Sequence, residues 1–162
     1  MKALLIDLDG TLIDTSAIEA LRQARKWRDC VANFGSTACF EGLHTALQQL
    51  TAAGTKIAVV TTSVSYYAQA ALRHHNIPHH ALVSYHDARP KPAPDPYLKA
   101  ASLLGIDTAE CIGVGDGEPD LHSLKSAGIK ALGAGWSPSL VFPDKWDAIL
   151  STPADLVSLH SI

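Results

Sequence analysis

Two carboxylates that lie two residues apart, Asp7 and Asp9, are the residues of this sequence best placed to do chemistry. They follow the apolar run Ala3–Ile6, whose length and continuity predict a buried strand of a parallel sheet. Ligands of open α/β sheets bind where such strands end. Two carboxylates held together repel each other unless a cation or a shared proton relieves the repulsion. We therefore interpret the run Asp7-Leu8-Asp9-Gly10-Thr11 as an acidic site, although Asp and Gly also favour turns.

Polar residues also follow three later predicted strands, and the carboxyl ends of parallel strands meet at one edge of a sheet. These residues are Thr61 and Thr62 after strand 56–60, Lys91 after strand 81–84, and Asp116 and Asp120 after strand 111–114. Hydroxyl groups and backbone N–H groups at a helix N-terminus can hold phosphate oxygens, and a lysine can neutralise charge on a transferring group. Several carboxylates at one site favour a hard divalent cation such as Mg²⁺. Taken alone, the threonines and the aspartates are explained by capping and turn chemistry, and the lysine by a solvated charge; together they predict a phosphate and metal site.

Strand-like and helix-like segments alternate along the chain, which predicts an α/β fold with a Rossmann-like, doubly wound parallel sheet. The predicted strands are 3–6, 56–60, 81–84, 111–114, 129–132 and 148–150. The predicted helices are 17–31, 42–53, 66–75, 95–104, 118–127 and 153–160. The length of 162 residues suits one domain, 1–162, with a short cap insert at about 15–40.

The charge and composition of the chain argue against some classes of binding partner. The net charge of −3 gives no sign of a general nucleic-acid footprint, and no apolar run is long enough to cross a bilayer. The first residues lead straight into the acidic motif and do not resemble a signal peptide. Three cysteines, an odd number without a framework pattern, indicate reduced thiols. We therefore expect a cytoplasmic protein that binds neither nucleic acid nor membrane.

The four motifs and their order resemble those of the haloacid dehalogenase superfamily, specifically its phosphatase branch. The resemblance covers essentially the whole chain and implies that Asp7 is the nucleophile, which forms an aspartyl-phosphate. It implies that Asp9 is the general acid for the leaving group and then the base for the hydrolytic water. By the same resemblance, Lys91 bridges the nucleophile and the phosphoryl group, whose oxygens are held by Thr61 and the backbone N–H of Thr62. An acid at position 9 favours a phosphatase, because dehalogenases of the superfamily lack one there.

The resemblance further implies a Mg²⁺ site formed by Asp7, the backbone carbonyl of Asp9 and Asp116, with Asp120 as an additional or more distant ligand. The Asp7 carboxylate is ionised at neutral pH and needs no activating base, but an anionic phosphate repels it. Mg²⁺ and a lysine offset that repulsion. The predicted activity is Mg²⁺-dependent hydrolysis of a phosphomonoester, with a small phosphorylated metabolite as substrate. A phosphotransferase or mutase, and a non-hydrolytic phospho-binding regulatory module, stay open as alternatives.

The insert between the first two motifs is too short for the full helical cap of related enzymes, so we expect an open site. A bulky substrate or a second protomer would then cover it, or selectivity would be low. Within the predicted helix 17–31, four basic residues cluster: Arg22, Arg25, Lys26 and Arg28. They form either a solvated face or an anion-steering surface that selects multiply charged phosphates. His86, in the loop that leads to Lys91, is a further candidate for contact with substrate.

Overall fold

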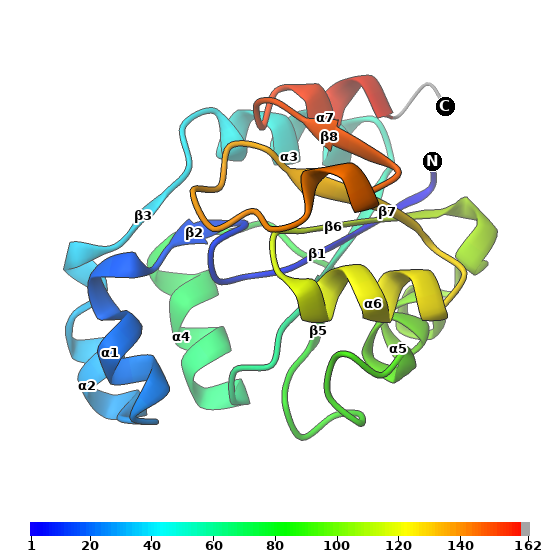
Figure 1. Ribbon diagram of the computed structural model, residues 1–162. Coiled ribbons are helices and arrows are strands. Elements are labelled where there is room, and N and C mark those ends of the chain that lie inside the picture. The colour runs from blue at the N-terminus through cyan, green and yellow to red at the C-terminus, as the bar shows by residue number, and fades with distance from the viewer. Residues whose placement is uncertain (160–162) are drawn as a thin grey trace.

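The computed structural model describes residues 1–159, and its main feature is a six-stranded parallel sheet with helices on both faces (Figure 1). In spatial order the strands are β5 (Ala81–Val83), β4 (Lys56–Val60), β1 (Ala3–Ile6), β6 (Cys111–Gly115), β7 (Lys130–Ala134) and β8 (Ala148–Leu150). The chain adds β4 and β5 on one side of β1 and then crosses over to add β6, β7 and β8 on the other. This topology confirms the predicted doubly wound sheet. Its switch point at β1 is the place where such sheets bind ligands.

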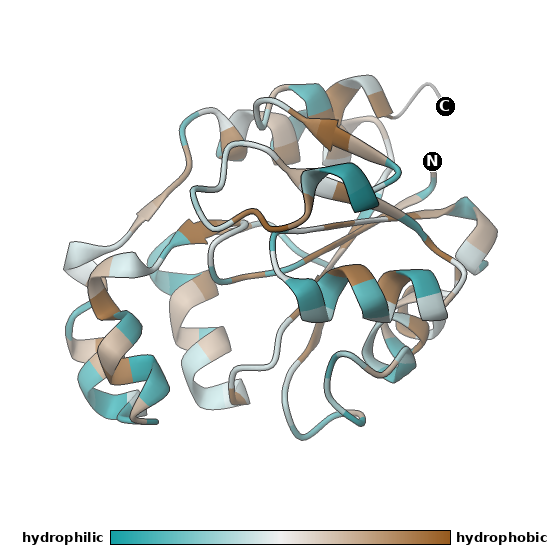
Figure 2. Cartoon of the chain, in the orientation of Figure 1, coloured by the Kyte–Doolittle hydropathy of each residue, from teal (hydrophilic) through white to brown (hydrophobic). Residues whose placement is uncertain are grey.

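The side chains of the central strands point alternately to the two faces of the sheet, and on each face they pack with helices in a hydrophobic layer. Leu4 and Ile6 of β1 pack with helices α3 (Leu43–Ala52), α4 (Ser65–His74) and α7 (Asp155–Ser158). Ala3 and Leu5 pack on the opposite face with α5 (Asp95–Leu104) and α6 (Glu118–Ser126). Figure 2 shows hydrophobic colour along the strands, while α6 alternates between hydrophilic and hydrophobic turns. The buried strands thus carry continuous apolar runs because helices cover both faces of the sheet.

The insert after β1 differs from its prediction. The continuous helix predicted over 17–31 is wrong, because the structure divides it into a 3₁₀ turn (Ser16–Ile18), α1 (Glu19–Gln23) and α2 (Trp27–Ala32). Helix α1 ends where Arg25 adopts the left-handed conformation, with φ of 55°. The N–H of Arg25 donates to the carbonyl of Arg22, and the N–H of Lys26 to that of Leu21. This is the Schellman arrangement, with arginine where glycine is usual.

A two-stranded antiparallel ribbon, β2 (Ile13–Asp14) with β3 (Ala38–Cys39), joins the insert to the core. Figure 1 shows α1 and α2 beside α4, at one end of the sheet. The sequence did not predict this ribbon, because two-residue strands carry no periodic pattern. The other predicted elements differ from the observed ones mainly at their ends. Residue 160 of the predicted last helix lies outside the described residues. No helix within residues 1–159 combines the length and the apolar character that crossing a membrane requires.

Candidate active site

Three buried carboxylates gather at the carboxyl edge of the sheet. Asp7 follows β1, Asp116 follows β6, and Asp120 lies in the first turn of α6. One carboxylate oxygen from each lies within 4.8 Å of the others. The residues that the sequence predicted as site residues line one cavity of about 600 Å³: Asp7, Asp9, Thr61, Thr62, Lys91, Asp116 and Asp120. The topology therefore brings four sequence motifs, far apart along the chain, to one place.

Lys91 is the positively charged side chain that contacts two of these three carboxylates. Its Nζ lies 2.7 Å from Asp7 Oδ1, 2.5 Å from Asp120 Oδ1 and 2.7 Å from the carbonyl oxygen of Val60. An ammonium group has three N–H donors, so these contacts use all of them. Burial by itself lowers the pKa of Lys91, but the carboxylates of Asp120 and Asp7 outweigh burial and raise it. Lys91 is therefore held charged against the two acids.

The ionised forms of these carboxylates are energetically unfavourable, because the acids are buried close to one another. Burial raises the pKa of Asp7 well above its ordinary value, the charge of Asp120 raises it further, and Lys91 acts against both. Burial and Asp120 likewise raise the pKa of Asp116, although the hydroxyls of Thr11 and Ser137 donate to it at 2.9 Å and 3.0 Å. A divalent cation would relieve this repulsion, and carboxylate oxygens are the ligands that Mg²⁺ prefers. The donor set of the cavity thus fits the predicted metal.

Two glycines allow the acids to approach the backbone this closely. Gly10 has φ of 84°, and a Cβ on it would lie 2.5 Å from Asp116 Oδ2. A Cβ on Gly115 would lie 2.6 Å from the Cβ of Asp120. A side chain at either position would push an acid out of the cluster. The two glycines are therefore required by packing, and Gly10 by backbone conformation as well.

The carboxylate of Asp9 is held by three donors from outside the acidic cluster. Ser63 Oγ donates to Oδ2 at 2.9 Å, and Tyr67 OH donates to Oδ1 at 2.5 Å. Nη2 of Arg22, from the insert, lies 3.0 Å from Oδ2. Burial and the charge of Asp9 raise the pKa of Tyr67, so its hydroxyl stays protonated as a donor.

The sequence did not predict the partnership between Arg22 and Asp9. The solvated-face interpretation is wrong for Arg22, whose side chain is only 19% exposed. Arg25, Lys26 and Arg28 are exposed. The spacing of the charges pointed to this segment of the chain. It did not show that one of the four basic residues turns inward.

Thr61 and Thr62 occupy different positions at the edge of the cavity. Thr61 is buried, its N–H donates to the carbonyl of Val83, and its hydroxyl oxygen accepts from the N–H of Ser63 at 3.0 Å. Its hydroxyl hydrogen can therefore still donate to an anion. Thr62 is exposed and lines both the acidic cavity and a smaller neighbouring one of about 340 Å³. His86 lines the smaller cavity and does not line the acidic one.

Comparison with known proteins identifies the class of enzyme. The family model described as haloacid dehalogenase-like hydrolase matches residues 21–128. The chain belongs to this family of hydrolases, and its curated relatives include phosphatases. A phosphoglycolate phosphatase of Xanthomonas campestris pv. campestris (strain 8004) is 32% identical over 124 residues, which cover 72% of this chain and 56% of that protein. Pyrophosphatase PpaX of Bacillus velezensis is 34% identical over 101 residues, 60% of this chain and 47% of that protein.

The chain thus spans about half the length of these two relatives. A solved structure, CbbY from Rhodobacter sphaeroides in complex with phosphate, has a TM-score of 0.81 with this chain at 20% identity, covering 96% of both chains. That likeness concerns the fold. Together these findings confirm the superfamily, the fold class and the phosphatase character of the relatives.

Proposed function

We propose that this protein is a Mg²⁺-dependent phosphatase that hydrolyses a phosphomonoester through an aspartyl-phosphate on Asp7. One observation carries the proposal: Asp7, Asp116 and Asp120 share a buried cluster with Lys91, whose Nζ contacts Asp7 directly. A structural ion pair would not need three acids around one lysine. The excess of negative charge, in a cavity that Thr61 also lines, suits a cation together with a phosphate.

In this proposal, Asp7 attacks phosphorus and the bond from phosphorus to the leaving oxygen breaks. Asp9 accepts from three donors as a carboxylate, so it must first take up a proton. It then donates this proton to the leaving oxygen, which departs as an alcohol rather than an alkoxide, an effect typically worth about 10²–10⁴ in rate. A water molecule then attacks the aspartyl-phosphate while Asp9 takes up its proton, which releases phosphate and restores Asp7. Lys91 neutralises charge on the phosphoryl group, and Thr61 with the backbone N–H of Thr62 holds its oxygens.

The cation would be held by Asp7, Asp116 and the backbone carbonyl of Asp9. Bound Mg²⁺ supplies positive charge that offsets the repulsion between a carboxylate nucleophile and an anionic phosphate. Asp120 Oδ1 already accepts from Lys91 and from Tyr97 OH, the latter at 2.8 Å. Asp120 therefore positions Lys91 and offers the cation only its second oxygen, which supports its place as an additional ligand.

The substrate we propose is a small phosphorylated metabolite. Support comes from the names of relatives such as phosphoglycolate phosphatase and N-acetylmuramic acid 6-phosphate phosphatase, the latter 28% identical over 93% of this chain. A single domain over 1–162 with an insert at about 15–40, a homo-oligomer that covers the open site, and a cytoplasmic location stay predictions.

The test is release of inorganic phosphate from a panel of phosphomonoesters, in Mg²⁺ and in chelator. We expect metal-dependent release that Asp7→Asn abolishes and Asp9→Asn slows by about 10²-fold or more. Asp144→Asn, the same change at an exposed aspartate, is the matched control. Full activity of Asp7→Asn would refute the proposal.

Two other results would identify the alternatives. Transfer of the phosphoryl group to a second substrate, without free phosphate, would indicate a phosphotransferase or mutase. A β-phosphoglucomutase of Bacillus subtilis is 37% identical over 35% of this chain. A long-lived aspartyl-phosphate without turnover would indicate a regulatory module.

A further inference from the structure

A second cavity, of about 340 Å³, adjoins the acidic cavity and is formed between the insert and the loops after β4 and β5. The two cavities share Arg22 and Thr62 in their linings. The two cavities therefore adjoin at these two residues, so a substrate whose phosphoryl group lies beside Asp7 would have its leaving group close to the second cavity. We call this second cavity the insert cavity.

The two cavities differ in charge. Six carboxylate residues line the acidic cavity: Asp7, Asp9, Asp14, Glu19, Asp116 and Asp120. Among the described residues, no acid lines the insert cavity, whereas Arg22, Arg25 and His86 do. This separation occurs in a chain whose net charge is −3. The acidic cavity suits a cation with the phosphoryl group, and the insert cavity suits an anion.

Arg22 lines both cavities, and one of its N–H donors has no acceptor among the described residues. Its Nη2 pairs with Asp9, and its Nη1 pairs with Glu19. Its Nε is buried and has no hydrogen-bond partner among the described residues. A buried N–H without an acceptor is unfavourable, and its burial also keeps it from direct contact with a molecule in either cavity.

We propose that the insert cavity binds the leaving group of the phosphomonoester, and that Arg25 pairs there with a second anionic group on that leaving group. This inference rests on the proposed phosphatase function and specifies its substrate class. Trp27 and Tyr85 also line the cavity and supply apolar surface for the carbon skeleton between the two anionic ends. The substrate is thus an organic phosphate with a carboxylate or a further phosphate on its leaving group.

The backbone conformation of Arg25 gives independent support. It is one of three described non-glycine residues with positive φ, and it occupies the position after a helix where glycine is usual. Any residue with a Cβ atom is disfavoured in this conformation, because the Cβ lies close to the following carbonyl oxygen. Such an outlier beside a candidate site suggests that the side chain is kept for a function rather than for stability.

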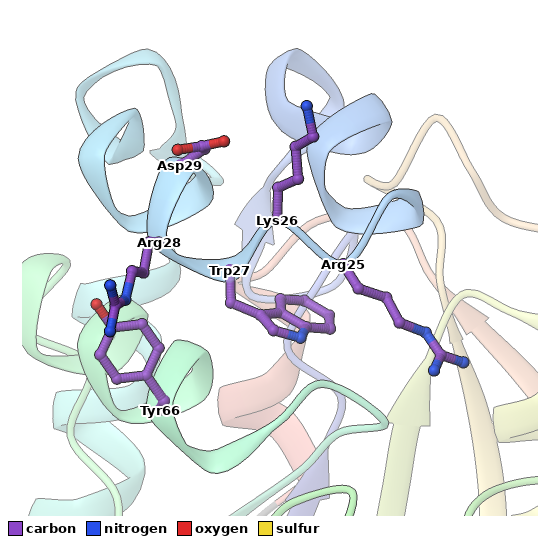
Figure 3. Close-up of a pocket in the computed structure, with 6 residues that line it drawn as sticks. All are labelled: Arg25, Lys26, Trp27, Arg28, Asp29 and Tyr66. Atoms are coloured by element: carbon purple, nitrogen blue, oxygen red, sulfur yellow. The ribbon is translucent and has the colours of Figure 1, made fainter.

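The other basic residues of the insert provide matched controls. Figure 3 shows Arg25, Trp27 and Arg28 on one side of the segment, with Arg25 and Arg28 diverging, while Lys26 points to the other side. Arg28 and Lys26 line an outer pocket with Arg25 but do not line the insert cavity. Removing Arg28 or Lys26 therefore changes the net charge as much as removing Arg25 does, without changing the insert cavity.

The experiment measures kcat/KM for ω-carboxyalkyl phosphates of increasing chain length, each paired with its neutral carboxamide. For the wild type we expect a preference for the carboxylate at one or two chain lengths. Arg25→Gln should lower that preference by roughly five- to ten-fold, as expected for loss of a partly exposed charge-assisted hydrogen bond. Arg25→Lys should retain part of it. Arg28→Gln and Lys26→Gln should keep the preference of the wild type.

Two results would overturn the inference. One is no preference for the carboxylate by the wild type at any chain length. The other is an equal loss in Arg25→Gln and Arg28→Gln, which would indicate general steering by charge. Thermal unfolding of each variant checks that it folds. Failure of the phosphatase proposal itself looks different, because the wild type would then release no phosphate from any of these compounds.

Discussion

Replacing Lys91 with methionine tests whether the acidic cluster depends on a cation for its stability. The side chain of Lys91 is 3% exposed, and its partners Asp7 and Asp120 are 11% and 6% exposed. Methionine keeps much of the volume and removes the charge. Three carboxylates would then share the cluster without the lysine that now contacts two of them.

The expected cost follows from the burial of these groups. Removing one partner of a buried ion pair typically destabilises a protein by about 3–5 kcal/mol, because the other partner is left buried and unpaired. For a chain of this size, that corresponds to a fall in melting temperature of about 6–20 °C. The charge of Lys91 opposes the rise in the pKa of Asp7, so part of the cost will appear as proton uptake by this acid.

The assay is urea unfolding at pH 7.5, in chelator and in excess Mg²⁺. A ligand that binds only the native state at 100 times its Kd adds about 2.7 kcal/mol to the free energy of unfolding. Mg²⁺ should stabilise Lys91→Met more than it stabilises the wild type, because the cation then faces acids that no lysine neutralises. Lys130→Met, at an exposed position on β7, is the matched control and should change little.

Two outcomes would refute this reasoning. The free energy of unfolding of Lys91→Met in chelator could lie within about 1 kcal/mol of the wild type, well below the cost of an unpaired buried charge. Alternatively, Mg²⁺ could stabilise the variant less than the wild type, which would mean that Lys91 helps to hold the cation rather than competing with it.

Three other predictions test the insert and its surroundings. Arg25→Gly should raise the free energy of unfolding by about 1 kcal/mol, measured by urea unfolding, because glycine is not strained at positive φ. Tyr67→Phe should lower kcat/KM for alkyl phosphates by roughly ten-fold, because Asp9 loses a hydrogen bond that fixes the orientation of its carboxyl group. The loss should be smaller for p-nitrophenyl phosphate, whose leaving group needs little acid. Burial and two neighbouring histidines lower the pKa of His75 below 6.5, so unfolding curves should show stability that is full above pH 6.5 and declines below it.

Each of these predictions has an outcome that contradicts it. A less stable Arg25→Gly would show that the arginine side chain contributes more to stability than its backbone conformation costs. Equal losses on both substrates for Tyr67→Phe would show that Tyr67 acts on something other than proton transfer by Asp9. If His75→Gln declined with acid as steeply as the wild type, the decline would have another source.

The part of the site that sequence reasoning predicted is the part set by topology. Asp7, Lys91 and Asp116 each follow a strand, and parallel strands bring their carboxyl ends together whatever the side chains are. The contacts of Asp9 with Arg22 and Tyr67 could not be predicted in this way. The contact with Tyr67 depends on how α4 packs against the sheet. The contact with Arg22 depends on the path of the insert, where α1 ends at an arginine and the sequence carries no glycine to mark that end. The site was thus predictable where the topology of the sheet positions it, and unpredictable where it depends on side-chain packing and on the irregular path of the insert.

The left-handed residue Arg25 changes how a small insert can influence the proposed reaction. A large cap would exclude water by closing over the substrate, and the short insert has too little chain for that. Instead, Arg22 of α1 reaches Asp9, and the break that follows at Arg25 ends the helix with the Arg25 side chain on the wall of the neighbouring cavity. Under the proposed mechanism, one helix end would then present one arginine to the general acid and another to the leaving group that receives its proton. Binding an anionic leaving group would thereby be coupled to the position of the acid, which a solvated basic helix over 17–31 could not achieve.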